Sequence, residues 1–115
     1  MEDDPSYQRY LQHILEREGY EVITASNGLL GLRKAREEKP ALLILDVMLP
    51  GLDGFEVCHR LRDDSATSGI PVIMHSAKGQ DADKVTALNV GANDFFPKPV
   101  DRVVLLSRIK ELLTA

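Results

Sequence analysis

One stretch constrains the fold of this chain more than any other, residues 41–54, ALLILDVMLPGLDG. Residues 42–45 are apolar without a break, and they lie between Pro40 and a loop rich in proline and glycine. Such a run is typical of a strand that is buried on both faces of a parallel sheet. The strand ends on a carboxylate, Asp46, and functional groups of open α/β sheets gather at the carboxyl ends of strands. Asp46 is therefore a candidate site residue, unless it only caps the following turn.

Helical and strand-like patterns alternate along the whole chain. Apolar residues recur at helical spacing in residues 5–18, 29–38, 54–62, 80–90 and 102–113. Short apolar or β-branched runs mark further strands at residues 20–25, 70–75 and 94–96. This alternation predicts one α/β domain over residues 1–115, with a parallel sheet covered by helices on both faces. Ser76 and Lys98 each follow a strand, as Asp46 does, so we expect their side chains at one edge of that sheet.

Composition narrows the classes of function. The chain has 115 residues, of which 43% are hydrophobic, and its formal net charge of -4 argues against direct binding of nucleic acid. No apolar run reaches the roughly 20 residues of a membrane helix, and the acidic N-terminus is unlike a signal peptide. The single cysteine, Cys58, excludes a disulfide framework and favours a cytoplasmic location.

A group of acidic residues indicates what this sheet edge does. Glu2 and Asp3 stand where a strand before the first helix would end, so with Asp46 they make three carboxylates at one edge. Neighbouring carboxylates repel each other, and a hard cation with oxygen ligands, such as Mg²⁺, relieves the repulsion. Lys98 would add a positive charge and Ser76 a hydroxyl. Together these are the parts of a phosphoryl-transfer site in which Asp46 is the nucleophile.

Each of these residues also has a simpler interpretation. Glu2 and Asp3 can be a solvated tail, Lys98 an exposed loop residue, and Ser76 a cap or turn residue. The phosphoryl-transfer interpretation is favoured because all of them fall at strand ends in one consistent order.

Four motifs together resemble the response-regulator receiver domain, the phospho-acceptor module of two-component signalling. They are EDD at residues 2–4, LDVMLPGLDG at 45–54, SAK at 76–78 and GANDFFPKPV at 91–100. The resemblance covers nearly the whole chain. It implies a flavodoxin-like, doubly wound parallel sheet with helices on both faces.

The resemblance also implies a role for each site residue. Asp46 would be the phosphorylation site. Asp3 would bind Mg²⁺ directly and Glu2 through water, and the backbone carbonyl of Met48 would be a further ligand.

A conformational switch is implied by the same resemblance. Ser76 resembles the family's switch hydroxyl, Lys98 its lysine, and Phe95 its switch aromatic, in a place where tyrosine is frequent. The Lys98–Pro99 peptide bond is expected to be cis.

The function that this resemblance implies is a phosphorylation switch rather than a classical enzyme. A sensor histidine kinase or a phosphotransfer protein would donate the phosphoryl group, and the domain would catalyse its own phosphorylation and slow autodephosphorylation. The phosphate would draw Ser76 toward it and turn Phe95 inward. This would change the surface of the helix from residue 80, the strand at 94–96 and the last helix, where a downstream effector protein or domain docks.

Two alternatives come from other classes of protein. An aspartate-nucleophile phosphatase would need a second acid two residues after the nucleophile, where this chain has Met48. A degenerate or truncated receiver could instead act as a phosphate-independent protein-interaction module.

The start of the chain departs from the family pattern. An apolar strand of about five residues normally precedes the acidic pair, and here only Met1 stands before Glu2. In the sheet order 2-1-3-4-5 that strand lies between two neighbours. About four buried side chains at roughly 1.5–3 kcal/mol each amount to about 6–12 kcal/mol, which is comparable to the typical stability of a whole domain.

We therefore expect a non-standard arrangement. Residues upstream of Met1, a strand borrowed from another chain, or a rearranged sheet could each replace the first strand. A homodimer contact or a domain swap that covers the gap is the expectation adopted here. Glu2 and Asp3 would then be displaced, and the Mg²⁺ site would be incomplete.

Overall fold

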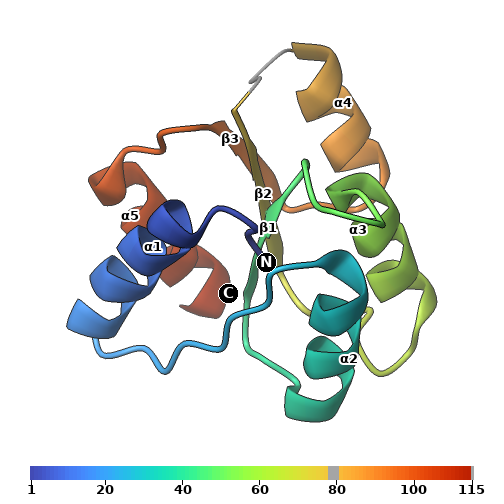
Figure 1. Ribbon diagram of the computed structural model, residues 1–115, viewed down its shortest axis with the longest axis horizontal. Coiled ribbons are helices and arrows are strands. Elements are labelled where there is room, and N and C mark those ends of the chain that lie inside the picture. The colour runs from blue at the N-terminus through green and yellow to red at the C-terminus, as the bar shows by residue number, and fades with distance from the viewer. Residues whose placement is uncertain (78–80, 115) are drawn as a thin grey trace.

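The computed structural model describes residues 1–77 and 81–114, apart from the side chains of residues 81 and 82, and shows a parallel sheet between two layers of helices (Figure 1). The elements in chain order are α1 (Pro5–Arg17), α2 (Gly28–Glu38), β1 (Leu43–Asp46), α3 (Gly54–Asp63), β2 (Val72–Ser76), α4 (Asp81–Asn89), β3 (Asp94–Pro97) and α5 (Arg102–Thr114). From α2 onward, this order confirms the predicted alternation of helices and strands. Within the described residues, no helix is long and apolar enough to cross a membrane.

The sheet brings three chain segments to one edge. Its order is β1-β2-β3, and both pairings are parallel. Asp46 lies opposite His75, and Ser76 lies opposite Pro97, the residue before Lys98. The carboxyl ends of all three strands therefore meet at one edge, as the sequence predicts.

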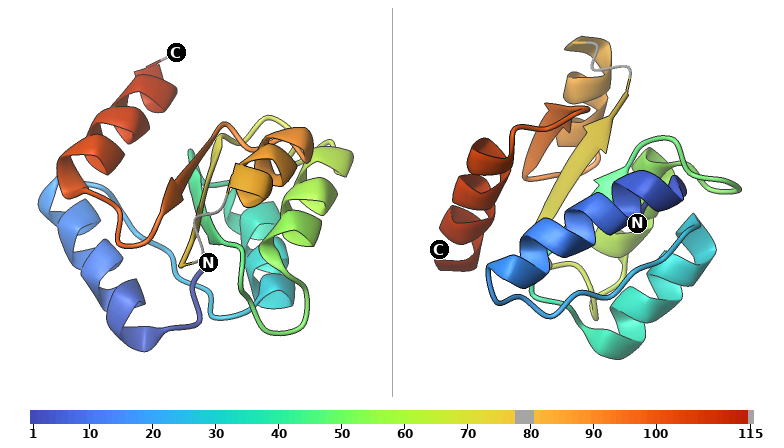
Figure 2. Two further views of the ribbon diagram at one scale, coloured as in Figure 1. Left: turned by 90° about the horizontal axis from the view of Figure 1, so that it is seen from above. Right: turned by 60° about the vertical axis from the view of Figure 1, so that its left-hand side comes forward.

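Each face of the sheet has its own core, and different helices cover the two faces (Figures 1 and 2). Helices α2, α3 and α4 pack on one face, where the buried cluster includes Leu45, Val57 and Met74. Helices α1 and α5 pack on the other, where the cluster includes Ile73 and Ile109. Because side chains alternate along a strand, the neighbouring β2 residues Ile73 and Met74 point to opposite faces of the sheet and belong to different cores.

Side chains at the helix starts explain where the helices begin. The Asp4 carboxylate accepts a hydrogen bond from the Ser6 backbone N–H at 2.9 Å and caps α1. Asn27 caps α2, and Asp53 caps α3, each by accepting from a backbone N–H in the first turn. A side-chain acceptor at this position satisfies one of the N–H groups that a helix start leaves free.

The prediction of a strand over residues 20–25 is wrong. This segment has no strand pairing. Within residues 1–77 and 81–114, the backbone bond that this segment makes on the side of β1 comes from the Glu2 N–H, which donates to the Ala25 carbonyl at 3.0 Å. A strand exists only through its ladder partner, and here Met1 and Glu2 alone occupy the partner's position.

Met1 and Glu2 bridge residues 20–25 and β1. The Met1 nitrogen donates to the Ile44 carbonyl at 2.6 Å, and the Asp46 N–H donates to the Met1 carbonyl at 3.0 Å. The expectation that Glu2 is displaced is therefore wrong, because these backbone bonds and the bond to Ala25 hold it in the ladder. A rearranged sheet is also wrong, because the three strands keep a regular parallel order.

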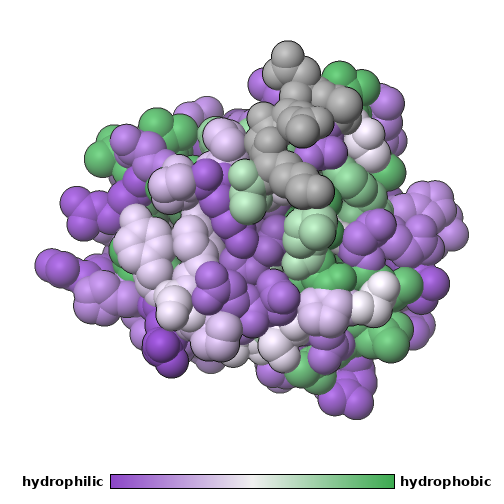
Figure 3. Space-filling view, turned by 45° about the horizontal axis from the view of Figure 1, so that its top comes forward, coloured by the Kyte–Doolittle hydropathy of each residue, from purple (hydrophilic) through white to green (hydrophobic). Residues whose placement is uncertain are grey.

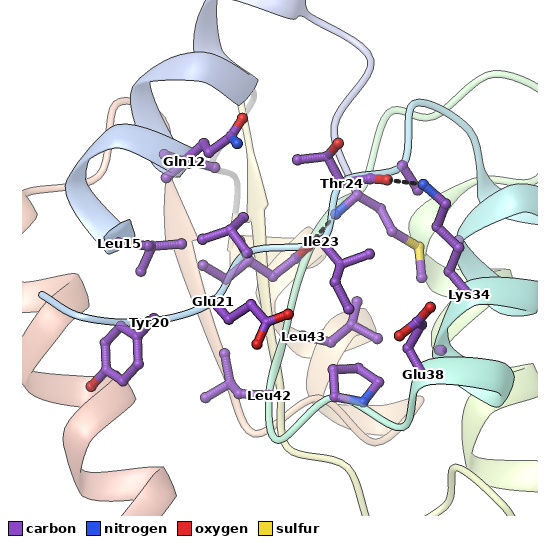
Figure 4. A pocket seen from close by; sticks show the side chains of 18 of the residues that line it. Gln12, Leu15, Tyr20, Glu21, Ile23, Thr24, Lys34, Glu38, Leu42 and Leu43 are labelled. Carbon is purple, nitrogen blue, oxygen red and sulfur yellow. Dashed lines mark hydrogen bonds between the residues drawn. The ribbon is translucent and has the colours of Figure 1, made fainter. Parts of the chain in front are cut away.

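An open groove remains beside this bridge (Figure 4). Its volume is about 450 Å³, and its walls are residues 20–25, β1, α1, α2 and α5. We call this space the strand groove. A homodimer contact or domain swap that covers it stays a prediction.

The loop after Asp46 depends on a glycine. The Gly54 N–H donates to the Val47 carbonyl at 2.8 Å, and a Cβ at Gly54 would lie 2.3 Å from the Asp46 carbonyl oxygen. We expect Gly54→Ala to lower the free energy of unfolding by about 1–3 kcal/mol, since the backbone must move to relieve the overlap. Urea unfolding measures this change.

Gly69→Ala is the matched control for that substitution. A Cβ at Gly69 meets nothing within 4 Å, so its stability should be unchanged or slightly raised. Equal stability of the two variants would show that the close approach at Gly54 does not constrain the loop.

Candidate functional site

A lysine bridges two buried carboxylates at the carboxyl edge of the sheet. The Lys98 Nζ donates to Asp46 Oδ2 at 2.7 Å and to Glu2 Oε1. Glu2 and Asp46 are each only 2% exposed, whereas 15% of the Lys98 side chain is exposed. The structure thus brings together three predicted site residues that are far apart in the sequence.

Burial and the hydrogen bonds within this group shift the pKa values of its two carboxyl groups in opposite directions. Burial, followed by the hydrogen bond with Asp46, raises the pKa of Glu2 to about 7, although Lys98 opposes the rise. Burial acts to raise the pKa of Asp46 as well, but hydrogen bonds with Glu2, Lys98 and the Met48 backbone hold it below its ordinary value. Asp46 is therefore the ionised member of the pair, and Glu2 is the member that still holds a proton below about pH 7.

The donor set fits a hard divalent cation. Glu2 Oε2 is buried, and among the described residues it has no hydrogen-bond partner. A cation beside Glu2 and Asp46 would satisfy that oxygen and replace the proton. Carboxylate oxygens are the ligands that Mg²⁺ prefers, so the residues present agree with a magnesium site.

A buried histidine lies behind the carboxylates. His75 is 1% exposed, and ligand atoms of His75, Glu2 and Asp46 lie within 4.8 Å of one another. Burial, with Lys98 adding to the effect, lowers the pKa of His75 to about 3, so its ring is neutral. The Tyr7 ring packs against it, with 5.3 Å between centroids. His75 therefore adds no charge to the site.

Tyr7 also contacts the lysine. The Lys98 Nζ lies 4.7 Å from the centroid of the Tyr7 ring, and the Tyr7 hydroxyl accepts a hydrogen bond from the Val100 N–H at 3.4 Å. A cation above an aromatic ring is attracted to its face. The helical spacing of residues 5–18 gives no sign of this contact.

Two further predicted metal ligands, Asp3 and the Met48 carbonyl, stand close to Glu2 and Asp46 in the sequence. Asp3 is exposed, next to the buried Glu2. Met48 is 55% exposed, and its N–H donates to Asp46 Oδ1 at 3.1 Å. Direct ligation by Asp3 and by the Met48 carbonyl stays a prediction.

The two predicted switch residues are buried beside the site. Ser76 is 1% exposed, and its carbonyl accepts from the Lys98 N–H at 2.9 Å. Phe95 is 5% exposed and packs in the core beneath α2, α3 and α4. The Lys98–Pro99 peptide bond is cis, which confirms that expectation.

The surface above these residues is mainly hydrophilic. Figure 3 looks onto the edge where the strands end, and hydrophilic side chains gather near the middle of that face with hydrophobic ones beside them. Such a surface suits a charged ligand that reaches Asp46 from solvent.

Met1 and Gly31 contribute to the position of Glu2 in the site. No sequence motif indicates this role. A Cβ at Gly31 would lie 2.2 Å from the Met1 sulfur, so the glycine makes room for the Met1 side chain. The backbone of Met1 in turn fixes Glu2 beside Asp46.

Comparisons with known proteins agree with this geometry. Residues 1–110 match the family described as the response regulator receiver domain. Over 113 residues the chain is 46% identical to the alkaline phosphatase synthesis transcriptional regulatory protein PhoP of Bacillus subtilis (strain 168), a match that covers 98% of this chain and 46% of that protein. The chain thus spans about half the length of several transcriptional regulators that it matches.

Solved structures show the same fold. A CheY-like response regulator receiver domain protein from Methanospirillum hungatei JF-1 has a TM-score of 0.91 and 34% identity, covering 98% of this chain and 89% of that one. The receiver domain of a sensor histidine kinase from Pseudomonas aeruginosa PAO1 has a TM-score of 0.92 and 26% identity, covering 100% of this chain and 94% of that one. The latter is described with a magnesium ion coordinated in the active site cleft.

The raised pKa of Glu2 predicts how stability depends on pH. An acid whose pKa rises from 4.5 to about 7 on folding stabilises the fold fully below pH 4.5, and this stabilisation is lost as the pH rises through 7. His75 and the Met1 amino group act in the opposite direction, because burial lowers their pKa values to about 3 and about 6 on folding. The contribution of Glu2 is therefore measured as a difference. In metal-free buffer, the free energy of unfolding of the original chain minus that of Glu2→Gln should fall between about pH 4.5 and pH 7, as measured by urea unfolding across the range.

Asp3→Asn serves as the control, because Asp3 is the exposed neighbour of Glu2. Its free energy of unfolding should depend on pH as that of the original chain does. A Glu2→Gln variant with an unchanged dependence on pH would contradict the assignment of the proton to Glu2.

Proposed function

We propose that this chain, which belongs to the response regulator receiver domain family, is a phosphorylation switch of two-component signalling with Asp46 as the phosphoryl acceptor. The observation that carries the proposal is the ionised Asp46 carboxylate held between the Lys98 ammonium and the Met48 N–H at the sheet edge. An ionised carboxylate with fixed cationic and N–H donors around it is suited to attack phosphorus and to hold the product.

The chemistry is a transfer between two nucleophiles. One oxygen of Asp46 forms a bond to the phosphorus, and the bond from phosphorus to the nitrogen of a donor phosphohistidine breaks, so the electron pair leaves with the imidazole. The Lys98 Nζ lies 2.7 Å from Asp46 Oδ2. As negative charge moves from the carboxylate to the phosphoryl oxygens, the ammonium group can donate hydrogen bonds to those oxygens. The Ser76 hydroxyl would donate to one of those oxygens.

A divalent cation would complete the charge balance. Receiver domains of this family bind Mg²⁺ in the active site, and here Glu2 and Asp46 would hold it, with Asp3 and the Met48 carbonyl as the further ligands that the family resemblance implies. When bound, Mg²⁺ neutralises charge on the phosphoryl oxygens. Glu2 would give up its proton to make room for that charge.

The partners follow from the same proposal. A sensor histidine kinase or a phosphotransfer protein would donate the phosphoryl group, and a downstream effector would read the state of the domain. Relatives include transcriptional regulators about twice as long as this chain, so any output domain and its target belong to the proposal as well. The phosphate-independent interaction module is not favoured, because acceptor, lysine and buried hydroxyl lie together.

The output surface would be α4, β3 and α5. Phe95 of β3 already lies in the core, so phosphorylation would stabilise this inward position through Ser76 rather than create it. Two packings of one element, biased by a local charge, are the usual basis of such a switch.

The direct test is chemical labelling of Asp46. With a small phosphodonor and Mg²⁺, the intact mass should rise by one phosphoryl group, and Asp46→Asn should abolish the rise. Asp53→Asn is the matched control, since asparagine caps a helix as well as aspartate does. Labelling that persists in Asp46→Asn would overturn the assignment.

Lys98→Ala and Ser76→Ala should damage the site in different ways. Loss of Lys98 leaves two carboxyl groups without their cation, so labelling should slow by tenfold or more and the switch should weaken. Ser76→Ala should label nearly normally, but the amide resonances of α4, β3 and α5 should no longer shift on phosphorylation. An equal, complete loss of labelling in both variants would contradict these separate roles.

A further inference from the structure

His75 is a buried polar side chain that the proposed phosphoryl transfer does not use. It lies in β2, next to Ser76, and is 1% exposed. Among the residues that the structure describes, neither nitrogen of its ring has a hydrogen-bond partner. Buried polar groups are nearly always hydrogen-bonded, because an unpaired one destabilises the fold. The imidazole therefore needs a ligand that the described part of the chain does not supply.

The register of the sheet directs this ring to the side of the Asp46 carboxylate. His75 and Asp46 are partners in the parallel pairing of β1 and β2. Side chains alternate along each strand, so residues paired in this way point to the same face of the sheet. Ile73, two residues before His75, belongs to the core beneath α1 and α5. The imidazole and the carboxylate therefore both project toward α1 and α5.

Glu2 brings a third ligand atom to the same place. One ligand atom from each of His75, Glu2 and Asp46 lies within 4.8 Å of the other two, and all three residues are buried. Glu2 Oε2, like the imidazole nitrogens, has no hydrogen-bond partner among the described residues. With bond lengths of about 2.0–2.2 Å, the ligand atoms around one zinc ion stand roughly 3–4 Å apart. Small side-chain rotations are therefore enough to bring these three atoms around one ion.

The lysine contacts leave these atoms accessible to an ion. The Lys98 Nζ donates to Glu2 Oε1 and to Asp46 Oδ2. Asp46 Oδ1 accepts a hydrogen bond from the Met48 N–H at 3.1 Å, and a carboxylate oxygen has a second lone pair for another partner. Glu2 Oε2 and the imidazole are contacted by neither group.

Tyr7 holds the imidazole in this position. Its ring packs against the His75 ring with 5.3 Å between the centroids and 49° between the ring planes. The imidazole is neutral, since burial lowers the pKa of His75 to about 3. A neutral imidazole nitrogen is the commonest metal ligand in proteins. A ring that packing already holds loses little conformational freedom when it binds an ion.

We propose that His75, Glu2 and Asp46 form a binding site for a first-row transition-metal cation, of which Zn²⁺ fits best. Imidazole nitrogen suits Zn²⁺ and other transition metals, whereas Mg²⁺ takes oxygen ligands. Three protein ligands with a fourth position for water are the ligand number of an open zinc site. Glu2 and Asp46 would also hold Mg²⁺, so Zn²⁺ competes with Mg²⁺; for this competition alone, the proposal rests on the proposed function.

Titrations of the metal-free 115-residue chain with Zn²⁺ and with Mg²⁺ test the proposal. In calorimetry, one Zn²⁺ should bind per chain, about a hundredfold or more tighter than Mg²⁺. His75→Leu should raise the Kd for Zn²⁺ by about tenfold or more and leave the Kd for Mg²⁺ within about twofold, because the lost ligand is a nitrogen. A Kd that rises equally for both ions would show a merely structural role for His75 and would overturn the proposal.

The ring nitrogens of His75 give a direct measurement on the original chain, whatever the stability of the variant. In nuclear magnetic resonance spectra, Zn²⁺ should shift one of them strongly, and Mg²⁺ should shift neither. The double variant His13→Gln/His59→Gln lacks the two exposed histidines and should bind Zn²⁺ with unchanged affinity. Ring nitrogens of His75 that saturating Zn²⁺ leaves unshifted, or binding that the double variant loses, would contradict the site.

Phosphoryl labelling keeps this proposal separate from the proposed function. Zn²⁺ should suppress the Mg²⁺-dependent labelling of the original chain, and His75→Leu should need about tenfold more Zn²⁺ or greater for the same suppression. Labelling that persists at saturating Zn²⁺ would argue against the shared use of Glu2 and Asp46. If Mg²⁺ alone gives no labelling, the proposed function fails, and the two Kd values and the His75 resonances still decide the zinc site.

Discussion

The contact of Lys98 with both Glu2 and Asp46 is the interaction on which the rest of the site depends. It joins the start of the chain, the end of β1 and the residue after β3. One ammonium cannot balance two buried carboxylates, so the pair keeps a proton on Glu2, and Asp46 stays ionised. Burial and the neighbouring Asp46 raise the pKa of Glu2, and the same two buried carboxyl groups make the site receptive to a divalent cation and, after that, to a phosphoryl group.

The bridge of Met1 and Glu2 connects this site to the strand groove. Its backbone bonds to Ile44, Asp46 and Ala25 close the upper end of the groove and set Glu2 beside Lys98. Gly31 makes room for the Met1 side chain that anchors the bridge. A contact that strengthens the backbone bonding beside β1 therefore also restrains the Glu2 carboxylate in the site.

The sequence predicted the parts of the site that follow from strand ends. Asp46, Ser76 and Lys98 converge because three parallel strands finish at one edge, and that requires only the pattern of apolar runs. The strand over residues 20–25 failed because pairing depends on a neighbour that the local pattern does not reveal. The expectation that Glu2 is displaced was wrong, because backbone bonds of Met1 and Glu2 hold it in place. Two residues are too few to show a strand pattern in the sequence. The contact of His75 with Tyr7 depends on packing between β2 and α1, which residue type and spacing do not specify.

The central claim is that the buried pair lacks one positive charge and that Mg²⁺ supplies it. Titration of the metal-free chain with Mg²⁺, followed by the amide resonances of Asp46 and Met48, tests this most directly when the original chain is compared with Glu2→Gln above the pKa of Glu2. The account predicts saturable binding by the original chain and at least a tenfold larger Kd for the variant, which corresponds to about 1.4 kcal/mol or more. Equal Kd values would contradict it.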